Sequence, residues 1–107
     1  LGEILDVEDP ADSEIGGRTV TGYALNQNFP NPFNPVTTIE YQLPIQAGIR
    51  LELLDITGRT VKILVDETKS AGVHRFRFNA GYLASGVYLY RLSAGDFTQT
   101  RRFILLK

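Results

Sequence analysis

The sequence predicts an all-β fold, an immunoglobulin-like antiparallel β-sandwich of about seven short strands. Apolar and polar residues alternate with a period of two in several segments, as they do in strands that bury one face. Turn-forming residues separate these segments at intervals of about 8 to 12 residues, a spacing typical of small sandwiches. No segment shows the 3.6-residue period of an amphipathic helix.

The first 22 residues have the composition of an acidic linker. Residues 1–17 contain no basic residue and six acids, whereas the rest of the chain holds all 11 Lys and Arg residues and the other six acids. Pro10 and the pair Gly16 and Gly17 interrupt regular structure. We therefore predict a linker at residues 1–22 and one domain at residues 23–107, with an edge strand at residues 18–23 as the alternative.

A proline-rich segment at residues 28–35, with the sequence Asn-Phe-Pro-Asn-Pro-Phe-Asn-Pro, opens the domain. Proline lacks a main-chain N–H and fixes φ, so this segment cannot continue a helix or a central strand. Asn side chains favour compact turns by bonding to nearby main chain. We expect an extended, turning segment that follows a short strand near residues 23–27.

The next three strands are predicted between residues 38 and 65 from their alternation. The residues expected to face the core are Ile39, Tyr41 and Leu43, then Ile49, Leu51 and Leu53, then Val61, Ile63 and Val65. Between the second and third of these strands, Asp55 should open a type I turn and Gly58 should take a positive φ, as in a hairpin loop.

Three further strands should follow a turn at residues 70–72. Their expected core residues are Phe76 and Phe78, then Tyr88, Tyr90 and Leu92, then Phe103 and Leu105. A loop at residues 79–86 should place Leu83 against the core, and residues 94–96 should close the last hairpin. Because the chain ends in an unbroken apolar run, we expect Ile104 or Leu106 to be covered on the opposite face.

The residue content argues against an enzyme. The absence of Cys removes disulfides, zinc clusters and thiol nucleophiles from consideration. His74 is the only histidine, and no serine near it has the sequence setting of a nucleophile elbow. Glu40 and Glu52 should lie on outward faces of neighbouring strands and pair with Arg50 or Lys62 instead of forming a catalytic carboxylate pair. We assign no catalytic residue and no cofactor.

The residue content also argues against several kinds of binding site. The basic residues are dispersed singly, which disfavours nucleic-acid binding, and no apolar run approaches the ~18 residues of a membrane span. The acids Asp6, Glu8, Asp9 and Asp12 lack the spacing of a calcium loop and fit a solvated linker better. An aromatic sugar platform is disfavoured because two of its candidate members, Tyr88 and Tyr90 but not Tyr82, lie on the predicted core face.

Four ordered segments resemble a type A C-terminal sorting domain of the type IX secretion system, and the resemblance covers about residues 23–107. The segments are residues 28–44, 54–59, 83–92 and 101–107. The resemblance implies a non-catalytic β-sandwich, carried by proteins that gram-negative bacteria export through the periplasm to the cell surface or the medium. It also implies recognition by the translocation machinery and, in many members, removal by a sortase-like protease.

The resemblance also assigns motifs by residue. The family's Pro-Asn-Pro motif falls on Pro30, Asn31 and Pro32, its Gly-x-Tyr motif on Gly86, Val87 and Tyr88, and its basic motif on Arg101, Arg102 and Lys107. Arginine stands at two positions where lysine is frequent, which keeps the charge but changes the geometry of any contact. Structural needs offer another explanation for some of these residues, because Gly86 should occupy a conformation that other residues avoid.

Two alternatives belong to other classes of protein. One is an accessory carbohydrate- or ligand-binding sandwich of a secreted enzyme, and the other is an immunoglobulin-like module of a flagellar hook-capping protein, which shares the Gly-Val-Tyr type of motif. The chain contains no Met, even at position 1, so we expect it to be part of a longer protein. The identity of the upstream segment would discriminate among these alternatives.

Overall fold

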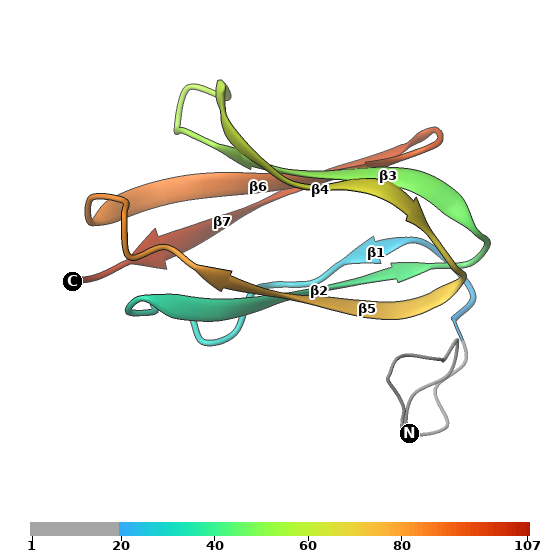
Figure 1. Cartoon of the computed structure of the whole chain (residues 1–107), viewed down its shortest axis with the longest axis horizontal. Helices are drawn as coiled ribbons and strands as arrows, with labels where there is room; N and C mark the ends of the chain where they lie inside the picture. The colour runs from blue at the N-terminus through green and yellow to red at the C-terminus, as the bar shows by residue number, and fades with distance from the viewer. Residues whose placement is uncertain (1–19) are drawn as a thin grey trace.

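A computed structural model describes residues 20–107, which form two antiparallel sheets packed face to face (Figure 1). The three-stranded sheet has the order β1-β2-β5 and the four-stranded sheet the order β4-β3-β6-β7. The strands are β1 (Ala24–Leu25), β2 (Val36–Leu43), β3 (Ala47–Leu54), β4 (Thr60–Lys69), β5 (Gly72–Asn79), β6 (Gly86–Ala94) and β7 (Phe97–Leu105). The predicted all-β sandwich is confirmed.

The chain crosses between the sheets after β2, after β4 and after β5, while β3 with β4 and β6 with β7 form hairpins within one sheet (Figure 1). Of the predicted linker, residues 1–19 lie outside the described part of the chain, and so do the acids considered for calcium. Residues 20–23 form no strand, and the first strand begins at Ala24.

The core lies between the two sheets and follows the predicted alternation along most strands. The side chains of Tyr90, Phe103 and Leu105 are fully buried, as are the inward residues of β2 and β3: Ile39, Tyr41, Leu43, Ile49, Leu51 and Leu53. Burying one such side chain stabilises the fold by about 1.5 to 3 kcal/mol, so this set dominates the stability. Phe76 and Leu83 are partly buried against the core, as predicted.

The prediction for β4 was wrong at two positions. Val61 and Ile63 are 45% and 44% exposed, while Leu64 is half-buried and Val65 is buried. The register between β3 and β4 shifts twice, so two extra residues on β4 interrupt the alternation. Each bulge turns the following side chains to the other face, which places Ile63 opposite the outward-facing Glu52.

The end of β7 also differs from the prediction. Phe103 and Leu105 are buried on the inner face, but Leu106 is 54% exposed and Ile104 is only half-buried. No element in the described residues covers the outer face of β7 at that end, because β3, β4 and β6 lie in the same sheet as β7. The apolar run therefore does not mean burial on both faces.

The hairpin loop after β3 forms as predicted. Asp55 Oδ1 accepts hydrogen bonds from the main-chain N–H groups of Thr57 (2.9 Å) and Arg59 (3.0 Å), and Gly58 has φ of 90°. The hydroxyl of Thr57 and the main-chain N–H of Arg59 stabilise the ionised carboxylate, which lowers the pKa of Asp55. The two-residue turn between β6 and β7 likewise places Gly95 at a positive φ of 58°.

Candidate functional site

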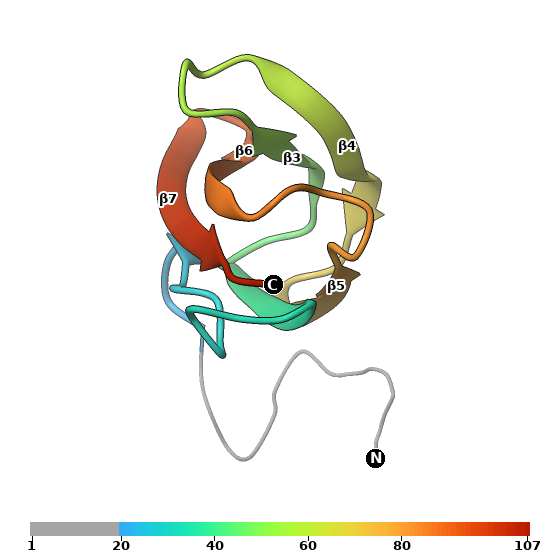
Figure 2. The same cartoon turned by 90° about the vertical axis from the view of Figure 1, so that its left-hand side faces the viewer.

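The three motifs, which lie far apart in the sequence, meet around β7. On one side of β7, the N-terminal end of β6 pairs with it, so that Gly86, Val87 and Tyr88 oppose Leu105, Ile104 and Phe103. On its other side, Phe33 forms a parallel bridge with Leu105. Figure 2 shows the proline-rich segment, in cyan, beside the end of β7, in red. The last strand therefore lies between the other two motifs.

Hydrogen bonds join the proline-rich segment to β7. The N–H of Phe33 donates to the carbonyl of Ile104 (3.0 Å), and the N–H of Leu106 donates to the carbonyl of Phe33 (3.0 Å). Asn31 Oδ1 accepts from the N–H of Ile104 (2.9 Å). Since the prolines have no N–H to donate, one Asn side chain and one Phe main chain close this part of the sheet edge.

A buried Asn anchors the same segment from the inside. Asn28 is 2% exposed, and its Nδ2 donates to Thr37 Oγ1 (2.9 Å) and to the carbonyl of Pro30 (3.1 Å). Its main-chain N–H donates to the hydroxyl of Tyr90 (2.8 Å), which itself donates to the carbonyl of Asn26 (2.7 Å). The expected bonding of Asn side chains to nearby main chain is confirmed at Asn28.

The motif residues themselves lie at the surface. Pro30, Asn31 and Pro32 are exposed, while the neighbouring Phe33 is buried and packs edge to face on Phe103 at a centroid distance of 4.8 Å. The buried anchors thus hold the Pro-Asn-Pro residues in a defined position and leave their side chains accessible.

The Gly-x-Tyr motif has one conformational and one packing role. Gly86 has φ of +155°, and a Cβ built there would come no closer than 4.0 Å to Tyr88, so conformation and not space requires the glycine. The hydroxyl of Tyr88 donates to the carbonyl of Ala84 (2.7 Å), and its ring packs on Phe103. Val87 is 41% exposed.

The three cations of the basic motif do not form one patch. Arg101 and Arg102 are adjacent on β7 and therefore point to opposite faces. Arg101 Nε donates to the carbonyl of Leu25 (2.5 Å), which links β7 to β1. Lys107 Nζ donates to the carbonyl of Gly81 (2.7 Å), in the loop that follows β5. Arg102 is exposed on the outer face.

A shallow groove of about 460 Å³ adjoins Arg102. Its lining combines polar and apolar residues from β6, β7 and the segment before β2: Gln27, Asn31, Leu89, Thr100, Arg101, Arg102 and Ile104. No acidic residue lines it. The sequence prediction located Asn31, Arg101 and Arg102. It missed Gln27, Leu89, Thr100 and Ile104, since nothing in their local sequence marks them as site residues.

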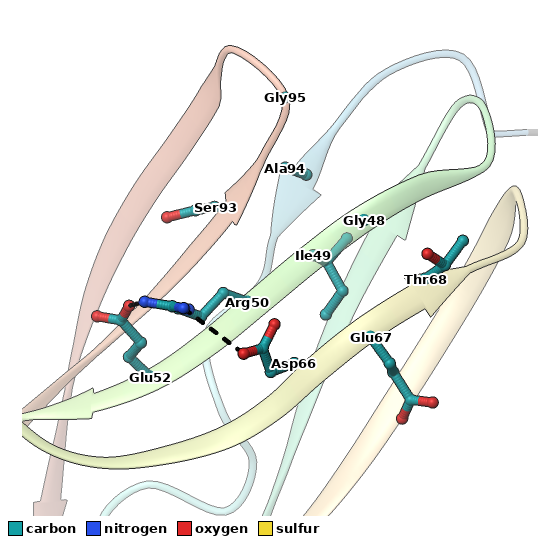
Figure 3. Close-up of a pocket in the computed structure, with 10 residues that line it drawn as sticks. All are labelled: Gly48, Ile49, Arg50, Glu52, Asp66, Glu67, Thr68, Ser93, Ala94 and Gly95. Carbon is teal, nitrogen blue, oxygen red and sulfur yellow. Dashed lines mark ion pairs between the residues drawn. The ribbon is translucent and has the colours of Figure 1, made fainter.

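A second groove of the same volume lies over β3 and β4 beside the turn between β6 and β7, and in it Arg50 pairs with two of the acids that line it (Figure 3). Arg50 lies 3.6 Å from Glu52 and 3.5 Å from Asp66, and Arg91 is 2.7 Å from Glu52. Burial raises the pKa of Glu52, but hydrogen bonds and charge from Arg91, with help from Thr60 and Arg50, outweigh burial and lower it.

Part of the predicted pairing of acids was wrong. Glu40 and Glu52 lie in different sheets, and Glu40 pairs with Arg75 at 3.1 Å. Lys62 pairs with neither acid; its Nζ lies 5.1 Å from the ring centroid of Tyr82. The prediction assumed that consecutive strands are neighbours, whereas the chain changes sheet between β2 and β3.

The residues considered for catalysis and sugar binding have structural partners. His74 Nε2 lies 2.8 Å from the carbonyl of Ser70, and its ring stacks on Tyr41. Tyr90 is buried and Tyr88 is half-buried, so of the three tyrosines considered for an aromatic platform only Tyr82 is exposed. Within residues 20–107, no group of three or more acids and histidines is placed to hold a metal ion, and no helix could cross a membrane.

The fold and the exposed motifs define a β-sandwich module that presents short sequence motifs around its last strand. The model of the secretion system C-terminal sorting domain family matches residues 27–106, and the chain belongs to this family. It is a sorting signal for type IX secretion. Membership implies export to the cell surface or the extracellular space in gram-negative bacteria of the Bacteroidetes.

The chain is similar to a solved structure. That structure is PorZ, an essential bacterial surface component of the type IX secretion system of Porphyromonas gingivalis, with a TM-score of 0.51 and 23% sequence identity. The similarity covers 80% of this chain and 12% of PorZ, and at this identity it supports the fold. No curated protein matches the chain.

Proposed function

We propose that the type IX translocation machinery recognises this domain at one composite surface, formed where the three motifs meet around β7, and that the domain itself is non-catalytic. The observation that supports this proposal is the direct bonding of Asn31 and Phe33 to Ile104 and Leu106. Because hydrogen bonds join the proline-rich segment to β7, and β7 pairs with the start of β6, a receptor would contact one folded surface and not three separate peptides.

In this proposal residues 1–22 link the exported cargo to the sorting domain at residues 23–107. A sortase-like protease cleaves within the linker after the protein has crossed the periplasm and the outer membrane. The acidic composition and the Gly16-Gly17 pair support this assignment, since proteolytic cuts concentrate in segments of small and polar residues. Mass measurement of the released domain should locate the cut within residues 1–22, and a first cut within residues 76–106 would contradict the assignment.

The composite surface is tested by replacing Arg101, Arg102 and Lys107 with Ala together. The variant should still fold, because it loses two side-chain hydrogen bonds, each typically worth about 0.5 to 1.5 kcal/mol, and keeps the core intact. It should no longer direct a reporter across the outer membrane of a host that carries the type IX machinery. Export is measured in that host, and folding is measured by thermal melting of the purified chain.

A matched control replaces Lys62, Lys69 and Arg77 with Ala, which removes the same charge from other parts of the domain. This control should be exported at the parental level. If the triple variant of the basic motif folds and is also exported at the parental level, the basic motif is not part of the recognised surface.

A further inference from the structure

We propose that the groove beside β7 binds an extended segment of a partner protein, whose carboxylate pairs with Arg102 and whose neighbouring apolar side chain packs on Leu89 and Ile104. This inference rests on the proposed function, because it gives the chemistry of the partner at the same surface. It also distinguishes Arg102 from the other two cations of the basic motif.

The distribution of ion pairs in the described part of the chain supports a partner that carries a carboxylate. Five cations are paired with carboxylates: Arg50, Arg59, Lys69, Arg75 and Arg91. Five described cations form no ion pair: Lys62, Arg77, Arg101, Arg102 and Lys107. The whole basic motif belongs to the second group, and the sequence contains no acid after Asp96. The end of β7 therefore carries positive charge that the domain itself does not neutralise.

Among the three motif cations, Arg102 is the one whose side chain makes no hydrogen bond within residues 20–107. Arg101 and Lys107 already donate to main-chain carbonyls. The exposed guanidinium of Arg102 can donate two hydrogen bonds to a carboxylate, as a bidentate pair, without breaking any contact of the fold.

The groove also offers apolar contact beside this charge. Leu89 lies opposite Arg102 in the register of β6 and β7, and Ile104 follows on the same face of β7. Both side chains are half-buried, so each retains apolar surface that a partner side chain can cover. An acidic residue next to an apolar one matches this arrangement.

Two side-chain amides in the groove can form hydrogen bonds with the main chain of a bound peptide. Asn31 uses its Oδ1 to hold Ile104, which leaves its Nδ2 as a donor. Gln27 uses its Nε2 to donate to Asn28 Oδ1 and to the carbonyl of Arg102, both at 2.7 Å, which leaves its Oε1 as an acceptor. One donor and one acceptor at the rim of a groove fit the alternating C=O and N–H groups of an extended segment.

The same features disfavour an anionic lipid surface as the partner. Binding to anionic lipid headgroups typically uses a cluster of about 4 to 8 Lys and Arg residues. The groove presents only one cation without a bond inside the domain, and apolar side chains flank it. A single carboxylate on a protein segment is the better match.

The first test is export of the reporter by Arg102→Glu, with Arg77→Glu as the control, since Arg77 is another exposed, unpaired cation but lies on β5. Export should fall at least about tenfold for Arg102→Glu and stay at the parental level for Arg77→Glu.

The outcomes distinguish this inference from the proposed function. If the variant with Ala at Arg101, Arg102 and Lys107 is not exported but Arg102→Glu is, the proposed function stands and this inference fails. If both are exported, both fail. Arg102→Gln replaces Arg102→Glu if the latter does not melt cooperatively.

The second test is a titration of the full chain with the capped peptide Thr-Val-Asp-Leu-Thr-Val, followed by the amide chemical shifts of Leu89, Arg102 and Ile104. These shifts should move with this peptide, and not with its Asp→Asn version or in the Arg102→Gln protein. Unmoved shifts, or equal movement with the Asn peptide, would overturn the inference. So would the same movement with phosphatidylglycerol vesicles, because that result would assign the groove to lipid.

Discussion

Asn31 Oδ1 accepts a hydrogen bond of 2.9 Å from the main-chain N–H of Ile104, 73 positions later in the chain. This bond connects the Pro-Asn-Pro motif to the strand that carries the basic motif. A side-chain amide thus occupies the place that a neighbouring strand would take, at an edge where prolines supply no N–H.

Replacing Asn31 with Ala should lower the free energy of unfolding by about 0.5 to 1.5 kcal/mol, because the Ile104 N–H loses its partner. Asn31→Asp keeps an oxygen that can accept this hydrogen bond, so its free energy of unfolding should fall by less. Hydrogen exchange at the Ile104 amide is the direct measurement, and it should be faster in Asn31→Ala. Unchanged exchange would show that the bond does not protect this edge in solution.

Replacing Phe103 with Ala should cost roughly 3 to 5 kcal/mol in urea melts, since its ring is fully buried against Phe33 and Tyr90. Leu106→Ala is the matched control on the same strand end. It should change stability by less than about 0.5 kcal/mol, because Leu106 is largely exposed. A loss below about 1 kcal/mol for Phe103→Ala would mean that β7 does not pack in solution.

Replacing Gly86 with Ala should cost about 1 to 3 kcal/mol, because φ of +155° strains any residue with a Cβ. Gly48→Ala should be neutral or slightly stabilising, since a Cβ there meets nothing within 4 Å and no positive φ is required. Equal unfolding free energies for the two variants would show that the Gly-x-Tyr glycine is not there for its conformation.

Stability should fall as pH rises from about 10 to 12. Burial raises the pKa of Tyr90 to about 12, although the N–H of Asn28 and the charge of Arg101 oppose the change. Since the folded pKa lies above the value of 10.0 for a free tyrosine, the protonated hydroxyl stabilises the fold below pH 10, and this contribution disappears as pH passes through the folded value.

Urea melts between pH 9 and 12 measure this dependence. Tyr90→Phe should reduce the slope without removing it, because burial also raises the pKa of Tyr41. At pH 7 the same variant should lose about 1 to 3 kcal/mol, because the buried N–H of Asn28 is left without an acceptor. A slope equal to that of the parent would contradict this role of Tyr90.

Local pattern was a good guide wherever one strand's own alternation decides which side chains are buried. The inward residues of β2 and the hairpin loop after β3 follow from period-two alternation and from the turn preferences of Asp55 and Gly58. The same rule failed on β4, because the exposure of Val61 and Ile63 depends on bulges in the pairing with β3. A bulge depends on two strands at once, so the alternation of one strand does not reveal it.

In the candidate site too, some features follow from local sequence and others from tertiary structure. The sequence by itself determined the β-sandwich, the positions of the three motifs and the family to which they belong, because these depend on local residue order. Only the tertiary structure decided that the motifs meet on β7, that Arg101 and Lys107 bond to the main chain, and that Arg102 remains available in a groove. Adjacent residues on a strand point to opposite faces, and what each face meets is determined by segments up to 76 positions away.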